Sequence, residues 1–275
     1  MTRTVAEKRA AFRALHIEGC FVLPNPWDVG SARMLQHLGF AALASTSSGH
    51  AWSQGRPDYG VTLEHVLAHL TELAASVDLP INADFESGFA AAPEDVADNV
   101  RRAIGTGIAG LSIEDRDIAA PFGLYDQAYA VERVRAARIA IASSGEDVLL
   151  VARTEGLLGD PTALTPAIDK LVAFADAGAD CLYAPGVREK TDIAAIVRAV
   201  APKPVNVLVM GPGLNLAELA DLGVRRISIG GALARAAWGG FLRSARAIAE
   251  EGRFDSFAEA APGAQINGFF SRPVA

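Results

Sequence analysis

Short apolar or β-branched runs alternate along the chain with longer segments in which apolar residues recur at helical spacing. Parallel strands buried on both faces read as continuous apolar runs, whereas surface helices carry one apolar stripe. The runs predict strands at 20–25, 40–46, 79–85, 108–115, 148–155, 180–186, 203–209 and 224–231. The other segments predict helices at 28–38, 62–77, 94–105, 126–143, 165–177, 189–200, 215–222 and 232–251.

This alternation of strands and helices within about 250 residues is typical of an α/β fold of the closed (β/α)8 TIM type. A doubly wound open sheet is the main alternative, but the stretch after the first run reads PNPWDVGSA and lacks the glycine-rich dinucleotide fingerprint. An N-terminal helix with Val5, Phe12 and Leu15 near one stripe should precede the barrel, and a helical extension should follow it. Since no linker interrupts the composition, we expect residues 1–275 to form a single domain.

Polar side chains stand at the ends of several predicted strands. Asp84 and Glu86 lie two positions apart, so in a strand they project to the same side. Two like charges held together raise each other's pKa, and a nearby cation removes that penalty. Other strand-end residues are Ser45, Thr46, Ser47, Ser48, Glu114, Asp115, Arg153, Glu155 and Asn206. Because a barrel gathers the carboxyl ends of its strands at one mouth, we expect these residues to form one site.

Such a set of side chains predicts a site for a cation together with an anion. Carboxylate oxygens are hard ligands that favour Mg²⁺ or Mn²⁺ over zinc. Arg153 can bind a substrate carboxylate through two parallel hydrogen bonds. Each of these residues taken singly could instead have a structural role. Arg153 could be an ion-pair partner of Glu155 or Glu114, and the serine run could be a turn. The other acids could be charges of a loop or of a helix start.

The overall composition narrows the class of function. The formal net charge is -7 and the pI about 5.3, with no basic run, which argues against nucleic-acid binding. No stretch approaches the roughly 20 apolar residues of a membrane span. Cys20 and Cys181 form no close-spaced motif, so we expect neither disulfide nor zinc ribbon, and a reducing cytoplasm is the simplest location. His65 and His69, one helical turn apart, are expected to be a solvated surface pair.

The chain resembles the isocitrate lyase and phosphoenolpyruvate mutase superfamily over nearly its whole length. The matching stretches are WDVGSARMLQHLGFAALASTSSG, GRPDYGVTLEHVLAHL, LPINADFESGF, GIAGLSIED, VARTEG, AFADAGADCLYAPG and KPVNVLV. The resemblance implies a (β/α)8 barrel, a Mg²⁺ site that Mn²⁺ could also fill, and a 2-oxo acid or enolate as the bound species. It also implies a homo-oligomer, a dimer or tetramer, in which a C-terminal helix is often exchanged between subunits.

The resemblance assigns roles to residues at the predicted mouth. It makes Asp84 a direct metal ligand, Glu86 a second metal acid with a longer side chain than the usual aspartate, and Glu114 a metal ligand through water. Arg153 matches the arginine that holds the substrate carboxylate. The remaining matches are Ser45, Thr46 and Ser47 at the pair that grips this carboxylate, Asp58 at a catalytic acid near the metal, and Asn206 at a substrate-binding asparagine.

Two departures from the superfamily bear on the reaction. Its lyases carry a Lys-Lys-Cys-Gly-His-type loop whose cysteine is the acid, but residues 115–126 here contain no Cys, His or Lys. The sixth strand ends in glutamate or histidine in the relatives, whereas this chain has Pro185 there. Two proton-handling groups are therefore missing, and Tyr125 or Asp117 would be candidates to replace the acid.

Decarboxylation of a 2-oxo diacid needs the fewest catalytic groups of the reactions considered, because a metal-stabilised enolate can take its proton from water. We therefore expect a Mg²⁺-dependent carbon–carbon lyase acting on a small 2-oxo or 2-hydroxy (di)carboxylate, with oxaloacetate-type decarboxylation favoured. A carbon–phosphorus mutase or phosphonate hydrolase is one alternative, with the glycines of MGPGL and SIGGAL as candidate phosphate-binding turns. A protein that binds Mg²⁺ and a 2-oxo acid without turnover is another.

Overall fold

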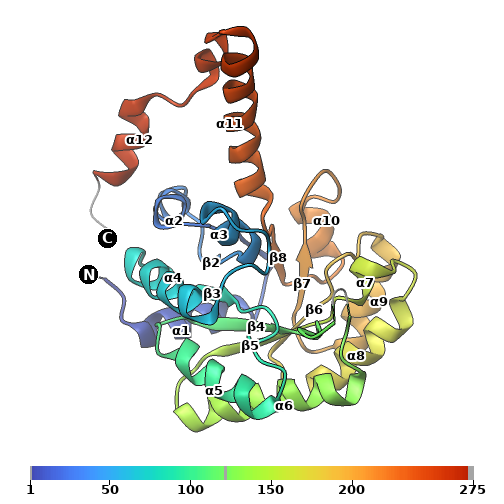
Figure 1. Ribbon diagram of the computed structural model, residues 1–275. Coiled ribbons are helices and arrows are strands. Elements are labelled where there is room, and N and C mark those ends of the chain that lie inside the picture. The colour runs from blue at the N-terminus through green and yellow to red at the C-terminus, as the bar shows by residue number, and fades with distance from the viewer. Residues whose placement is uncertain (1, 121–122, 272–275) are drawn as a thin grey trace.

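A computed structural model describes residues 2–120 and 123–271 of the chain. Within them, eight parallel strands form a nearly closed barrel in the order β1-β8-β7-β6-β5-β4-β3-β2 (Figure 1). The strands are β1 (Phe21–Leu23), β2 (Leu43–Ala44), β3 (Ile81–Asp84), β4 (Gly110–Glu114), β5 (Leu149–Arg153), β6 (Cys181–Tyr183), β7 (Val205–Leu208) and β8 (Arg226–Ser228). The Ala44 N–H bonds to the Pro24 carbonyl at 3.0 Å where the two ends of the sheet meet. The predicted (β/α)8 fold is confirmed.

Most of the helices cover the outside of the barrel and link successive strands, whereas one precedes β1 and three follow β8. In the described part of the chain the helices are α1 (Val5–Leu15), α2 (Val29–His37), α3 (Ser47–Ser53), α4 (Leu63–Ser76), α5 (Pro93–Ile104), α6 (Gln127–Ser144), α7 (Gly156–Gly159), α8 (Leu164–Asp176), α9 (Lys190–Val200), α10 (Leu216–Asp221), α11 (Ala232–Glu251), the 3-10 helix η1 (Asp255–Glu259) and α12 (Gly263–Phe270). The predicted helices agree with these bounds to within a few residues. Helices α3 and α7 were not predicted, because neither is long enough to show a helical period.

Helix α1 closes the end of the barrel opposite the site. Phe12 is fully buried in a small cluster with Leu23 of β1 and Leu149 of β5. Lys8 donates to the carbonyls of Ala74 and Val77 at the end of α4, and Arg9 Nε donates to the Ile108 carbonyl at 3.0 Å, just before β4. Because this end is filled, access to the barrel interior is from the carboxyl ends of the strands.

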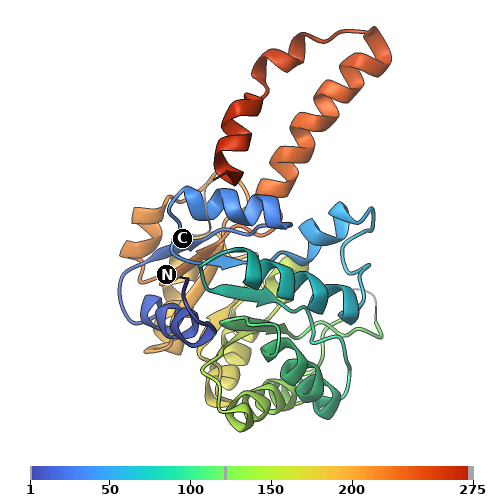
Figure 2. The same ribbon diagram turned by 90° about the vertical axis from the view of Figure 1, so that its left-hand side faces the viewer.

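The C-terminal helices form an arm that leaves the barrel after β8 (Figures 1 and 2). Helix α11 extends outward, and the chain returns through η1 to α12, which packs on α2. Arg33 of α2 donates to the Phe270 carbonyl at 3.0 Å. The expected helical extension is thus present. None of the helices in the described part of the chain is long and apolar enough to cross a membrane.

Candidate active site

A cavity of about 650 Å³ opens at the carboxyl ends of the strands. Clefts and cavities of this size with a few convergent polar groups are typical binding sites for small molecules. The predicted site residues that line it are Ser45, Thr46, Ser47, Ser48, Asp58, Asp84, Arg153 and Glu155. Further polar lining residues are Asn25, Tyr59, Asn82, Ser112, Arg116, Tyr183, Arg226 and Ser228.

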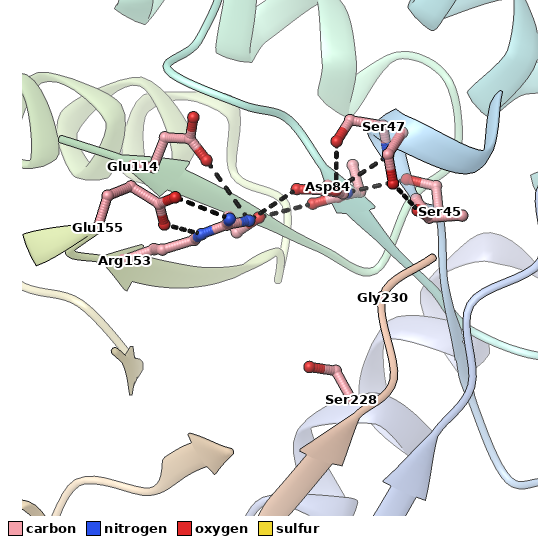
Figure 3. Close-up of polar contacts among 12 residues, drawn as sticks. Ser45, Ser47, Asp84, Glu114, Arg153, Glu155, Ser228 and Gly230 are labelled. Carbon is pink, nitrogen blue, oxygen red and sulfur yellow. Dashed lines mark hydrogen bonds and ion pairs between the residues drawn. The ribbon is translucent and has the colours of Figure 1, made fainter. Parts of the chain in front are cut away.

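Asp84 is held at the end of β3 by the serines that follow β2 (Figure 3). The Asp84 N–H donates to the Ser45 hydroxyl at 2.9 Å. The N–H and the hydroxyl of Ser47 both donate to Asp84 Oδ2 at 2.9 Å. These bonds fix the orientation of the carboxylate, and they show that the serine run does more than turn the chain.

The serine segment also begins the short helix α3. Thr46 is its N-cap, and its hydroxyl accepts a hydrogen bond from the Gly49 N–H at 3.2 Å. Gly49 is needed for close packing, because a Cβ at this position would lie 2.7 Å from Thr46 Cγ2 and 3.0 Å from Trp27 Cβ. The cap and the glycine together hold Ser47 where its N–H reaches Asp84.

The guanidinium of Arg153 lies among three carboxylates (Figure 3). Glu155 binds it through two contacts, Nε with Oε1 and Nη2 with Oε2, the second at 3.1 Å. Nη1 lies 3.4 Å from Asp84 Oδ1 and 3.4 Å from Glu114 Oε2. Arg153 therefore is an ion-pair partner of Glu155 and Glu114, as one structural interpretation anticipated, and it also lines the cavity.

Asp115 supports the segment on which Arg153 and Glu155 stand. Its carboxylate is buried and accepts hydrogen bonds from the Thr154 hydroxyl and the Glu155 N–H, each at 2.8 Å. Lys170 Nζ of α8 lies 2.7 Å from the same group. Asp115 is therefore a buried structural anchor rather than a loop charge.

Tyr59 is a site residue that the sequence did not single out. Its hydroxyl donates to Glu114 Oε1 at 3.0 Å, and the Arg116 guanidinium stacks on its ring at 3.5 Å. Tyr59 and Glu86 have φ values of 59° and 49°, a region that costs energy in residues other than glycine. Backbone strain of this kind gathers at functional sites. Tyr59 comes from a loop without periodic pattern, so no sequence signal placed it here.

Glu86 and Glu114 are buried acids with raised pKa values. Burial, followed by the charges of Asp84 and Glu114, raises the pKa of Glu86 to about 9. Burial also raises the pKa of Glu114, against the opposing charge of Arg153. Glu86 Oε1 is buried and has no hydrogen-bond partner within the described ranges. The site therefore holds more carboxyl groups than its own cations neutralise.

This surplus of carboxyl groups fits a divalent cation. In the described part of the chain, no three acidic, histidine or cysteine side chains already converge on one metal position. Arg153 instead stands between Asp84 and Glu114. The unpartnered Glu86 oxygen and the raised pKa values are nevertheless what crowded acids show until a cation joins them. Asp84, Glu86 and Glu114 are the residues that would hold Mg²⁺, which prefers oxygen ligands.

Besides the buried acids Glu86, Glu114 and Asp115, the predicted residues Asn206 and Tyr125 do not line the cavity. Asn206 is fully buried, and its side chain bonds to Ser228 and Arg226, so it supports the lining from below. Tyr125 packs against Arg133, with 4.3 Å between the guanidinium carbon and the ring centroid, and does not line the cavity. In the same loop, Gly123 and Leu124 line the cavity, whereas residues 121–122 lie outside the described ranges.

Known proteins share sequence and fold with this chain. The sequence pattern of the family described as phosphoenolpyruvate phosphomutase matches residues 12–249. An uncharacterised protein of Mycobacterium tuberculosis is 32% identical over 242 residues, 87% of this chain and 89% of that protein. An oxaloacetate decarboxylase of Pseudomonas paraeruginosa is 32% identical over 230 residues, 80% of this chain and 77% of that enzyme. A crystal structure from Burkholderia cenocepacia, provisionally named a lyase/mutase, has a TM-score of 0.94 at 46% identity and 98% coverage of both chains.

Proposed function

We propose that the chain, which belongs to the phosphoenolpyruvate phosphomutase family, is a Mg²⁺-dependent carbon–carbon lyase acting on a small 2-oxo or 2-hydroxy carboxylate. Decarboxylation of an oxaloacetate-type diacid is the reaction that we favour. The observation that carries the proposal is the placement of Asp84 and Arg153 in one cavity, where one suits a metal ion and the other a carboxylate. Similarity to an oxaloacetate decarboxylase supports it. We further expect the active form to be a homo-oligomer.

In the proposed site, one group of residues binds the metal ion and another binds the substrate carboxylate. Mg²⁺ or Mn²⁺ held by Asp84, Glu86 and Glu114 would polarise the 2-oxo group and favour the developing enolate. Arg153 binds the substrate carboxylate, with its fork oriented by Glu155. The hydrogen bonds that fix Asp84 and Arg153 in advance reduce the reorganisation needed when the substrate arrives.

The enolate that remains after loss of CO₂ needs one proton. The Tyr59 hydroxyl lines the cavity and is hydrogen-bonded to Glu114, whose pKa is raised by burial. This pair can hold a proton next to the reacting carbon, in the place of the missing cysteine acid. Asp58, which also lines the cavity at its exposed rim, is the second group placed to move a proton.

Steady-state rates on oxaloacetate, methylisocitrate and phosphonopyruvate with Mg²⁺, beside a metal-only control, test the proposal. We expect turnover of oxaloacetate above the metal-only rate and little cleavage of methylisocitrate. Cleavage of methylisocitrate with kcat of roughly 1 s⁻¹ or more would contradict the decarboxylase assignment. Turnover of phosphonopyruvate alone would favour carbon–phosphorus chemistry, and Mg²⁺-dependent binding without turnover would favour a binding protein.

A further inference from the structure

Arg226 is a buried cation without a carboxylate partner among the described residues. It lies on β8, is 2% exposed and lines the cavity. Its Nε donates to Asn206 Oδ1 at 2.9 Å, and its Nη1 donates to Asn82 Oδ1 at 3.2 Å. Both acceptors are neutral amides, and they engage two of the five N–H groups of a guanidinium. Burying a charge costs free energy unless an opposite charge is buried with it. An anion bound next to Arg226 would remove that cost.

The other arginines of the cavity are in different situations. Arg153 lies among three carboxylates, and Arg116 is only partly buried and stacks on the ring of Tyr59. Burial lowers the pKa of Arg226, as expected where desolvation of a cation is not offset by a neighbouring acid. The protein itself therefore neutralises Arg153 but leaves the charge of Arg226 uncompensated in the cavity floor.

The position of Arg226 relative to Asp84 is set by β3. Asn82 and Asp84 are two residues apart on this strand, point to the same side and both line the cavity. A strand rises about 3.3 Å per residue, so the guanidinium bonded to Asn82 lies roughly 7 Å deeper than the level of Asp84. Ser228 stands above Arg226 on β8, with its hydroxyl directed into the open centre of the view in Figure 3.

We infer that Arg226 forms an anion subsite in the cavity floor, which takes the distal carboxylate of a 2-oxo diacid whose 2-oxo acid end is bound at Asp84 and Arg153. The inference rests on the proposed function and names its substrate class, dianionic rather than monoanionic 2-oxo acids. The depth of two strand residues suits a diacid with a four-carbon chain. In the proposed reaction this distal carboxylate leaves as neutral CO₂ and its electron pair passes to the enolate, so Arg226 contributes to binding of the diacid and not to the rate of carbon–carbon cleavage. The planar fork of Arg226, oriented by Asn82 and Asn206, matches a carboxylate in geometry as well as charge.

Equilibrium binding to the full chain loaded with Mg²⁺ tests this subsite. The probes are 3,3-difluorooxaloacetate and 3,3-difluoro-2-oxobutyrate, which share the 2-oxo acid end and differ in a distal carboxylate against a methyl group. The wild type should bind the diacid at least about tenfold more tightly. Arg226→Gln keeps an amide donor but removes the charge, so it should weaken the diacid about tenfold or more and leave the monoacid nearly unchanged.

Arg225→Gln is the matched control, because Arg225 is the neighbouring residue and its guanidinium donates to the Gly19 carbonyl outside the cavity. It should change neither affinity. Equal affinity of the wild type for the two probes overturns the subsite. An equal loss for both probes in Arg226→Gln also overturns it, since a purely structural link between β3, β7 and β8 would act on both.

Two further arms keep the test decisive. If Arg226→Gln does not fold, Arg226→Lys keeps the charge but loses the planar guanidinium, so its preference for the diacid should be smaller than that of the wild type and still present. Equal affinity for the two probes in a folded Arg226→Lys protein overturns the subsite. Phosphonopyruvate bound more tightly than the diacid would overturn the assignment to a carboxylate. Binding measured without Mg²⁺ separates the proposed function from the Arg226 subsite. If the monoacid binds equally well without Mg²⁺, the proposed function is wrong. The ratio of the affinities for the two probes still measures the contribution of Arg226 in that case.

Discussion

Glu155 binds Arg153 through two side-chain contacts, so one edge of the guanidinium is occupied before any substrate arrives. The Nη1 side of the fork, which faces Asp84 and Glu114, remains as the side on which a substrate carboxylate can compete. Glu155 thereby fixes the plane of the guanidinium rather than only its charge. A lysine at position 153 could satisfy the charge but not this planar geometry.

Arg153→Lys is accordingly expected to weaken binding of pyruvate-like acids at least about tenfold, or about 1.4 kcal/mol or more. Calorimetric titration of pyruvate into the Mg²⁺-loaded protein measures the effect. Arg116→Lys is a useful control, because Arg116 stacks on Tyr59 at the same mouth without a place in the proposed carboxylate site. Unchanged affinity in Arg153→Lys would reduce Arg153 to a structural ion-pair partner.

Asp84→Ala should abolish activity and its dependence on Mg²⁺ while the barrel stays folded. The side chain stands at the end of a strand, and its removal deprives Ser47 of an acceptor without opening the core. Glu86→Ala should be milder if Glu86 reaches the metal through water. Calorimetry with Mg²⁺ and a 2-oxo acid, beside circular dichroism for the fold, checks both variants. Wild-type affinities in Asp84→Ala would show that the metal assignment is wrong.

The barrel could be predicted because its signal is distributed over many residues. Each buried strand reads as an apolar run, and the polar residues at the run ends meet at one mouth once the sheet closes. Arg226 was overlooked although it had a signal: it alternates with Ser228 within a predicted strand, so both had to face the barrel interior. No pattern in the sequence indicated the hydrogen bond between Tyr59 and Glu114, since it joins a loop to a strand end 55 residues away.

For His69, the helical spacing of apolar residues was a better guide than the general expectation that histidine pairs on a helix are exposed. It was predicted to form a solvated pair with His65, but it is 7% exposed and stacks on His50 of α3 with ring centroids 3.7 Å apart. The other buried residues of α4 are Val66, Leu70, Leu73 and Ala74. Position 69 falls in that same apolar stripe, so the helical spacing itself placed this histidine inside.

The burial of His69 makes stability depend on pH. Burial, together with the neighbouring His50, lowers the pKa of His69 from 6.5 to about 3, so the folded chain keeps this ring neutral where the unfolded chain protonates it. The stabilising contribution is full above pH 6.5 and is lost as the pH falls from there toward 3. Between pH 6 and pH 5 the loss approaches about 1.4 kcal/mol per pH unit.

His69→Gln removes that contribution and should flatten the pH dependence of the unfolding free energy by about this amount. Urea denaturation at pH 7, 6 and 5 measures it. Ala68→Gln, on the exposed face of the same helix, introduces the same side chain without removing a titratable group, and as the control it should leave the wild-type slope. An equal slope in wild type and His69→Gln would mean that the buried ring does not stay neutral.

Tyr59→Phe tests whether the Tyr59 hydroxyl replaces the missing cysteine acid. The variant keeps the ring under Arg116 but loses the hydrogen bond to Glu114. Positioned general acids contribute roughly 10²–10⁴ in rate, so we expect kcat for oxaloacetate to fall at least about a hundredfold, with pyruvate affinity nearly unchanged. Tyr125→Phe is the matched control, because Tyr125 packs on Arg133 outside the cavity and should leave kcat intact. A kcat that falls in Tyr125→Phe but not in Tyr59→Phe would return the role of the acid to the 115–126 loop.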